Sequence, residues 1–209
     1  MPKSTTASLQ RKRPVRQRNR RNPGIRRPIH LRPHQWKLKQ FNHTAQSLGT
    51  GVVVGAKAIQ LDDLSNYLEY SALFDQYMIT GVKIDFIPKH NVSEMGSTRA
   101  VPVLHFWRDH DDATAPSTTL NTALENQSVK TRMLNRPQSF FLKPSILVEA
   151  YRGVASTSYS PKWKQWIDMA HADVPHYGYK YFIEDAGFSA AEDICDVFLT
   201  LYFKTRGVR

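Results

Sequence analysis

The sequence predicts an all-β protein: a single eight-stranded antiparallel jelly-roll sandwich with a disordered basic N-terminal arm and one short helix. Apolar runs of strand length recur along residues 35–209, separated by polar or proline-bearing loops of unequal length. This pattern favours an antiparallel sandwich over a sheet with helical crossovers. The charge is also polarised, because residues 1–61 hold 14 Lys or Arg and no Asp or Glu, whereas residues 62–209 hold 15 basic and 18 acidic residues.

The predicted arm covers residues 1–34, and the predicted sandwich domain covers residues 35–209. Prolines interrupt any helix in the first of these segments, and its apolar side chains are too few to offset the entropy lost on ordering. A formal net charge of +11 indicates a polyanionic partner, either nucleic acid or an acidic membrane surface. Because the excess charge lies at one end, we expect an arm that binds nucleic acid.

Cationic side chains on an unstructured segment bind phosphates without reading bases, so their affinity falls steeply with salt. Lys37 and Lys39 alternate with Trp36 and Leu38, which places both lysines on one face beside the arm. The predicted nucleic-acid contacts are Arg11, Lys12, Arg13, Arg16, Arg18, Arg20, Arg21, Arg26, Arg27, Arg32, Lys37 and Lys39. The first seven of these, Arg11, Lys12, Arg13, Arg16, Arg18, Arg20 and Arg21, also have the composition of a nuclear import signal.

After the arm, residues 35–58 predict a first strand followed by a turn at the glycine-bounded run GTGVVVG. The segment LSNYLEYSALFD predicts the short helix, with Ser65 as its cap. Its aromatic side chains Tyr67, Tyr70 and Phe74 share one face, which we expect to cover an edge of the sandwich.

The next segment, YMITGVKIDFIPK, alternates as a half-buried strand that ends at Pro88. Its expected inward residues are Met78, Val82, Ile84 and Phe86, and its expected outward residues are Lys83 and Asp85. Further strands are predicted at residues 101–107, 128–134, 139–144, 146–152, 177–183 and 194–206. In the last of these, the alternation places the lone cysteine, Cys195, on the buried face.

Trp36 and Trp107 offer aromatic faces on which unpaired bases could stack. A tryptophan in a strand of alternating pattern more often packs in the core, and this is the preferred interpretation for both. The sequence contains neither a His-Glu-x-x-His, a Gly-x-Ser-x-Gly nor a Walker motif. We therefore expect no enzymatic activity and no cofactor.

One acidic cluster requires a separate interpretation. Asp109, Asp111 and Asp112 are weak candidates for a metal site, which His171, Asp173 and His176 would complete. Against a metal site, these residues lie at a strand end and in a loop rich in turn residues. The preferred expectation is that no metal is bound.

Several segments resemble the capsid proteins of small circular single-stranded DNA viruses that encode a replication protein, the circoviruses and their relatives. The most specific is LFDQYMITGVKIDFIP, which looks like the second strand region of those capsids. The other matching segments are RKRPVRQRNRR, VLHFWRDHDDAT, WIDMAHADVPHYGYKYFI and FLTLYFKTR. The resemblance covers most of the chain.

The resemblance implies a viral coat protein, with sixty copies in a T=1 icosahedral shell and an inward arm that contacts the genome. The implied partners are a circular single-stranded DNA genome, or host RNA in recombinant particles, together with host nuclear import receptors and an unidentified cell-surface receptor. The implied locations are the virion and, during assembly, the host nucleus. No membrane insertion is expected, since no apolar run approaches the roughly 18 residues of a membrane span.

Two other functions share some of these features. A ribosomal or other RNA-binding accessory protein would have a similar basic tail, but it would stay monomeric and bind folded RNA. A metal-dependent hydrolase built on a sandwich would use the Asp109 cluster and would lose its activity on Asp111→Ala.

Removal of residues 1–33 is expected to leave the sandwich folded and to abolish both nucleic-acid binding and nuclear accumulation, because the excess positive charge lies in the arm. Circular dichroism, oligonucleotide binding and the location of a fluorescent fusion would measure the three effects. Unfolding of the truncated chain would place the domain boundary elsewhere.

Overall fold

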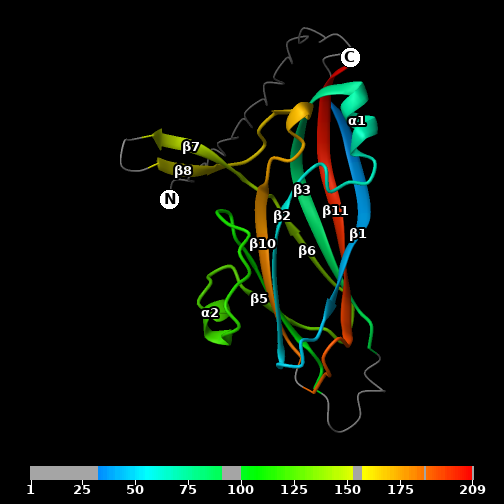
Figure 1. The fold of residues 1–209 in the computed structure, drawn as a ribbon, viewed down its shortest axis with the longest axis vertical. Helices are drawn as coiled ribbons and strands as arrows, with labels where there is room; N and C mark the ends of the chain where they lie inside the picture. The colour runs from blue at the N-terminus through cyan, green and yellow to red at the C-terminus, as the bar shows by residue number, and fades with distance from the viewer. Residues whose placement is uncertain (1–32, 91–99, 153–156, 186, 209) are drawn as a thin grey trace, which may run out of the picture.

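The computed structural model describes residues 33–90, 100–152, 157–185 and 187–208. Its strands form two main antiparallel sheets, which Figure 1 shows as two layers along the long axis. One sheet has the order β1 (His34–Gln46), β11 (Asp193–Val208), β3 (Phe74–Pro88), β6 (Gln138–Leu142). The other has the order β2 (Val52–Ile59), β10 (His176–Glu184), β4 (Val103–Arg108), β5 (Lys130–Met133). This arrangement is the jelly roll that the sequence predicted.

The last strand, β11, forms the centre of the first sheet. It pairs with β1 on one side and with β3 on the other over nearly its whole length. Its alternation follows the prediction, since Cys195 is fully buried and Val197, Leu199, Leu201 and Phe203 also face the core. The intervening residues face outward and are more exposed, with Thr200 as a buried exception.

The core lies between the two sheets and is rich in aromatic rings. Phe86 of β3 is completely buried, and its ring meets Phe106 of β4 at 6.3 Å and Tyr181 of β10 at 5.5 Å between centroids. Phe140 of β6 stacks on Phe106 at 4.2 Å. Rings from both sheets therefore interlock, and this packing holds the layers together.

The alternation predicted for β3 is correct from Val82 to Phe86 but wrong for Met78. A β-bulge at Thr80 breaks the register between β3 and β11, so that Ile79 is paired with Phe203 while Met78 is paired with the outward Lys204. Ile79 consequently lies in the main core cluster, whereas Met78 is buried, at 8% exposure, outside that cluster. A bulge adds one residue and reverses the alternation beyond it, which a strict period of two cannot anticipate.

The predicted turn at GTGVVVG is only partly correct. Gly49 and Gly51 have φ of +71° and +81°, and they form the turn after β1. The valines that follow belong to β2, which the sequence analysis missed. Gly55 lies within that strand, where a Cβ atom would come 2.3 Å from the ring of Tyr181, so glycine makes room for this core ring.

The predicted helix exists as α1 (Tyr67–Leu73), but Ser65 does not cap it. The N-cap residue is Asn66, which makes no side-chain capping bond, and backbone carbonyls of Leu64 and Asn66 accept from the first amides. Tyr70 packs on Trp36 and Phe203, at 5.0 and 5.3 Å between ring centroids. The helix thus covers the end of the sheet near the start of β1, as Figure 1 shows.

Eight strands make up the two jelly-roll sheets apart from the short β9, in agreement with the predicted number, but their membership differs. The missed β2 is one of them, while the predicted strand at residues 146–152 is β7 (Ile146–Arg152), which pairs with β8 (Thr157–Lys162) outside both sheets. This β7–β8 hairpin projects sideways from the sandwich (Figure 1). The remaining elements are β9 (Ile167–Asp168) beside β3, a 3-10 turn (Met169–His171) and α2 (Leu120–Leu124).

Within the described residues, no helix is long and apolar enough to cross a membrane. The described chain begins at Pro33, and β1 begins at His34. Along the chain, the predicted arm therefore leads directly into β1, which is an edge strand of the β1-β11-β3-β6 sheet.

Replacing Phe86 by alanine is expected to lower the free energy of unfolding by about 3–5 kcal/mol, because it leaves a cavity among rings of both sheets. Phe41→Ala on the outer surface, where 55% of the side chain is exposed, is the matched control and is expected to cost less than about 1 kcal/mol. Chemical denaturation measures both values. Equal losses for the two variants would contradict the assigned core.

Candidate nucleic-acid interface

Ten of the twelve predicted nucleic-acid contacts lie outside the described residues. These ten include every residue of the predicted nuclear import signal. They are Arg11, Lys12, Arg13, Arg16, Arg18, Arg20, Arg21, Arg26, Arg27 and Arg32.

The other two predicted contacts, Lys37 and Lys39, are exposed on the outward side of β1. Their register partners on β11 are Tyr202 and Thr200, whose side chains also face outward. The alternation extends this surface to Lys83 on β3 and Lys204 on β11. We call this outward side of the β1-β11-β3-β6 sheet the basic face.

Asp85 is the acidic residue at the centre of this face. Its carboxylate lies 2.6 Å from the Lys83 ammonium and 3.8 Å from that of Lys39, and it accepts a hydrogen bond from Ser139. Burial alone would raise the pKa of Asp85, but the bonds from Lys83 and Ser139 outweigh it and lower this pKa. One carboxylate therefore faces two lysines, and the face keeps a positive balance.

Aromatic rings lie among these cations. The ammonium of Lys37 is 5.7 Å from the centre of the Tyr202 ring, and that of Lys39 is 4.7 Å from the Phe198 ring. Phe41 meets Phe198 edge to face, and Phe141 on β6 meets Tyr202 in the same way at 5.8 Å. Cations interleaved with exposed rings are typical of surfaces that bind single-stranded nucleic acid.

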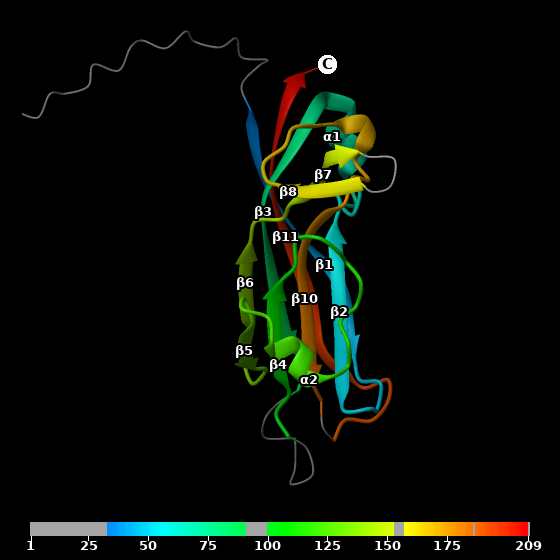
Figure 2. The same cartoon turned by 90° about the vertical axis from the view of Figure 1, so that its left-hand side faces the viewer.

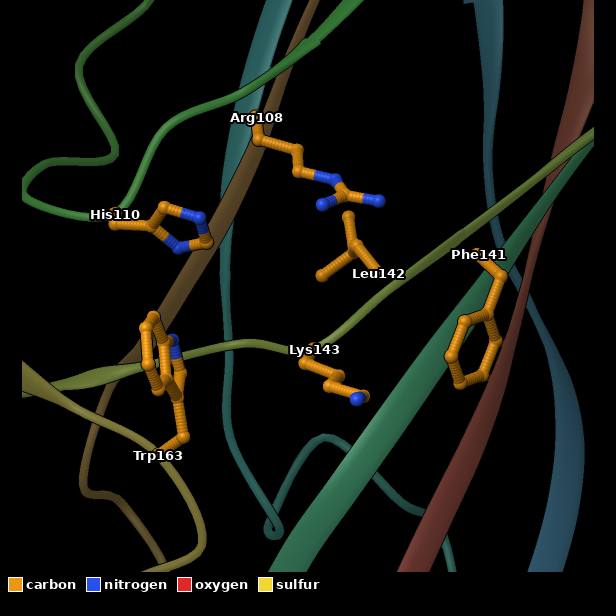
Figure 3. Close-up of a pocket in the computed structure, with 6 residues that line it drawn as sticks. All are labelled: Arg108, His110, Phe141, Leu142, Lys143 and Trp163. Atoms are coloured by element: carbon orange, nitrogen blue, oxygen red, sulfur yellow. The ribbon is translucent and has the colours of Figure 1, made fainter. Parts of the chain in front are cut away.

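A pocket of about 330 Å³ adjoins the β6 edge of this face, and Figure 3 shows its lining. We call it the Trp163 pocket. Arg108 extends into it from the end of β4, and Lys143 follows β6 on the opposite side, as the close-up shows. The full lining is Arg108, His110, Phe141, Leu142, Lys143 and Trp163, which includes two cations and no carboxylate.

The imidazole of His110 stands edge-on to Trp163 in this pocket, at 6.4 Å between centroids. Burial lowers the pKa of His110, and the nearby Arg108 charge lowers it further. At neutral pH the positive charge of the pocket therefore comes from Arg108 and Lys143.

The structure brings Asp109, Asp111 and Asp112 together, with ligand oxygens within 4.8 Å of one another. A lysine pairs with two of them, since the Lys180 ammonium lies 2.8 Å from Asp109 and 2.5 Å from Asp112. Burial alone would lower the pKa of Lys180, but these bonds outweigh it and raise this pKa. The cluster is thus explained as an ion-pair network that joins β10 to the loop after β4.

The second candidate cluster does not join the first in the part of the chain that the structure describes. His176 is buried in β10 and its Nδ1–H donates to the carbonyl of Val174, while the carbonyl of His171 accepts from the Tyr77 hydroxyl. Burial lowers the pKa of His176 to about 4, against the opposing effect of its backbone hydrogen bonds. His176 is therefore a neutral core residue at physiological pH.

Both tryptophans weighed for base stacking pack against protein side chains, Trp36 beside the main core and Trp107 in a separate cluster beneath α2. Trp107 is almost wholly buried in a small cluster with Ala123 and Phe182. Trp36 stacks on Phe203, and its indole N–H donates to Thr205 at 2.9 Å. The exposed rings of the candidate interface are instead Phe41, Phe141 and Trp163.

Most of this interface was not predicted from the sequence. The alternation that puts Cys195 on the buried face of the last strand also puts Tyr202 and Lys204 outward, and the same argument applied to SFFLKP would have separated the outward Phe141 from the buried Phe140. The Trp163 pocket had no comparable signal, because its residues come from three separate loops and strand ends.

Two four-stranded antiparallel sheets with these strand orders define the jelly-roll class, and comparison with known proteins specifies the family. The family model of the circovirus capsid protein matches residues 2–209, so the chain belongs to this family. The family is one of structural proteins and places the chain in the virion. No curated protein sequence matches this chain.

Solved structures share the fold at low sequence identity. The 60-mer BFDV capsid protein matches with a TM-score of 0.59 and 17% identity, covering 85% of this chain and 95% of that one. The coat of mud crab tombus-like virus matches with a TM-score of 0.53 and 12% identity, covering 99% and 94%. A virus-like particle of the nodavirus of the giant freshwater prawn Macrobrachium rosenbergii matches with a TM-score of 0.52 and 10% identity, covering 88% of this chain and 97% of that one.

The buried His176 is expected to make stability fall with acidification. Its pKa is about 4 in the folded chain and 6.5 in the unfolded one, so its contribution is complete above pH 6.5 and is lost progressively down to pH 4. The loss amounts to about 3 kcal/mol. Unfolding free energies measured across this range should show a flatter slope for His176→Gln than for the parent chain, and identical slopes would contradict a neutral buried imidazole.

Proposed function

We propose that the protein assembles into a T=1 icosahedral shell of 60 subunits and packages a circular single-stranded DNA genome through its basic arm. The observation that carries this proposal is the polarity of the chain. Residues 1–61 contain 14 Lys or Arg and no Asp or Glu. These cations lie just before and within the first strands of a sandwich of the circovirus capsid family. A neutral body and a strongly basic leader match a shell and its polyanionic content.

The number of subunits rests on the fold and on a relative. The BFDV capsid protein, which shares this jelly roll, forms a 60-mer. Sixty copies around icosahedral axes bury the sides of the sandwich and bring sixty arms into one interior. Identical arms then act on one nucleic acid together, so modest affinity per arm suffices.

The arm is proposed to act by charge and not by base recognition. Guanidinium and ammonium groups replace counterions along the phosphate backbone, and flexible contacts of this kind tolerate any sequence. Lys37 and Lys39 extend the same charge onto the outward side of β1, which begins two residues after Arg32. Residues 1–34 are accordingly proposed as the packaging arm and residues 35–209 as the shell domain.

The arm is also proposed to direct nuclear import before assembly. The cluster from Arg11 to Arg21 has the basic composition that import receptors bind, and free subunits would expose it. Once the arm is neutralised by DNA inside a shell, the same charges are no longer available. An unidentified cell-surface receptor would instead contact the outer surface of the shell.

Expression of the full chain without a viral genome is expected to yield closed particles that contain host nucleic acid, whereas a chain lacking residues 1–33 should yield nucleic-acid-free material. Electron microscopy and the ratio of absorbance at 260 and 280 nm measure the two outcomes. A 24.0 kDa monomer under all conditions would support the RNA-binding accessory protein instead.

A further inference from the structure

A continuous row of cations and rings crosses the basic face from the edge strand near the arm to the Trp163 pocket. Lys37 on β1 lies over Tyr202 on β11, and Tyr202 meets Phe141 edge to face. Phe141 also lines the pocket, where Lys143, Arg108 and Trp163 follow. Each step is therefore a contact or a shared wall.

Phe141 links the basic face to the Trp163 pocket, and its ring can lie where it does because residue 81 is a glycine without a side chain. At Gly81, a Cβ atom would come within 2.6 Å of the Phe141 ring. The ring consequently lies over the backbone of β3, and 51% of the Phe141 side chain remains exposed. Trp163, with 57% of its side chain exposed, presents a second ring on the far side of the pocket.

The cations of this row are available for an external anion. Within the described residues, neither Lys37, Lys143 nor the guanidinium of Arg108 forms an ion pair. On the same face, Asp85 is engaged by Lys39 and Lys83, and Asp196 is paired with Lys89. A row of free positive charges beside exposed rings is complementary to a polymer that carries both phosphates and flat bases.

We propose that single-stranded nucleic acid follows this row, with phosphates at Lys37, Lys143 and Arg108 and with bases stacked on Phe141 and Trp163. The inference deepens the proposed packaging function and rests on it, because the arm would deliver the strand to the β1 edge. The sheet is roughly 15 Å across, from a strand spacing of about 4.8 Å, so the row spans a few nucleotides. The sandwich then adds base stacking, independent of base identity, to a strand that the arm holds by charge, and this stacking is too weak to retain the strand without the arm.

Stacking and charge make separate, measurable contributions. Phe141→Leu and Trp163→Leu remove the aromatic faces at unchanged charge, and each is expected to weaken binding of a fluorescein-labelled oligothymidylate by at least about fivefold. The slope of log affinity against log salt should stay the same in both. Lys37→Gln and Lys143→Gln should instead each reduce that slope by about 0.7.

Matched variants test the assignment in the full-length protein. Tyr159→Leu removes a similarly exposed ring on β8, outside the basic face, and is expected to leave affinity unchanged. Phe141→Tyr and Trp163→Phe keep a ring at each site and are expected to retain binding. Equal unfolding midpoints of these variants and the parent chain would exclude loss of the fold as the cause.

The outcomes separate this inference from the packaging proposal. If the parent chain binds the oligonucleotide and Phe141→Leu and Trp163→Leu bind equally well, the row is overturned while packaging by the arm stands. Impaired particle formation in those variants with unchanged binding would assign the row to contacts between copies of the chain and would also overturn it. If the parent chain binds no single-stranded nucleic acid at low salt, both proposals fail.

Discussion

The double pairing of β11 is the constraint on which the rest of the molecule depends. This C-terminal strand lies between β1 and β3, so backbone hydrogen bonds on both of its edges join the two ends of the described chain. Its inward side chains supply one wall of the core, and its outward side chains Tyr202 and Lys204 supply the middle of the basic face. One strand therefore determines both the stability of the sandwich and the alignment of the surface residues. Because β1 and β3 are distant from β11 in the sequence, pairing them closes long loops and costs chain entropy. The contacts that offset this cost form only when β11 docks between its two partners.

The two faces of the β1-β11-β3-β6 sheet show how a period of two divides structural from functional residues. On β3, Val82, Ile84 and Phe86 are buried without solvent contact, while Lys83 and Asp85 between them form the ion pairs of the basic face. The bulge at Thr80 interrupts this alternation. Next to it, Gly81 has no side chain on the outward side, and the Phe141 ring lies over its backbone. The same irregularity that places Met78 outside the main core cluster thus also shapes the outer surface.

Sequence reasoning recovered the features that depend on local pattern. It predicted β3 to β7, β10 and β11, the inward Cys195 and the jelly roll, because alternation and turn residues are local signals, but it missed β8 and the two-residue β9. It missed β2 because the glycines of GTGVVVG resemble a turn, and only the space needed by Tyr181 explains Gly55. It also could not separate β7 from the jelly-roll strands, since pairing partners are not encoded locally. For the interface, alternation found Lys37 and Lys39, whereas the Trp163 pocket depends on loops that meet only in three dimensions.

The β7–β8 hairpin differs from every other strand pair in its relation to the sandwich. Its strands are paired with each other and, along the chain, follow β6 of one sheet and precede β10 of the other. Figure 2 shows the hairpin beside the upper part of the sandwich. Substitutions in its exposed positions leave the register of both sheets untouched, unlike substitutions in β3 or β11. Mutational tolerance is therefore expected to be unevenly distributed over the molecule, with the exposed positions of this hairpin free to change while the paired strands of both sheets remain constrained.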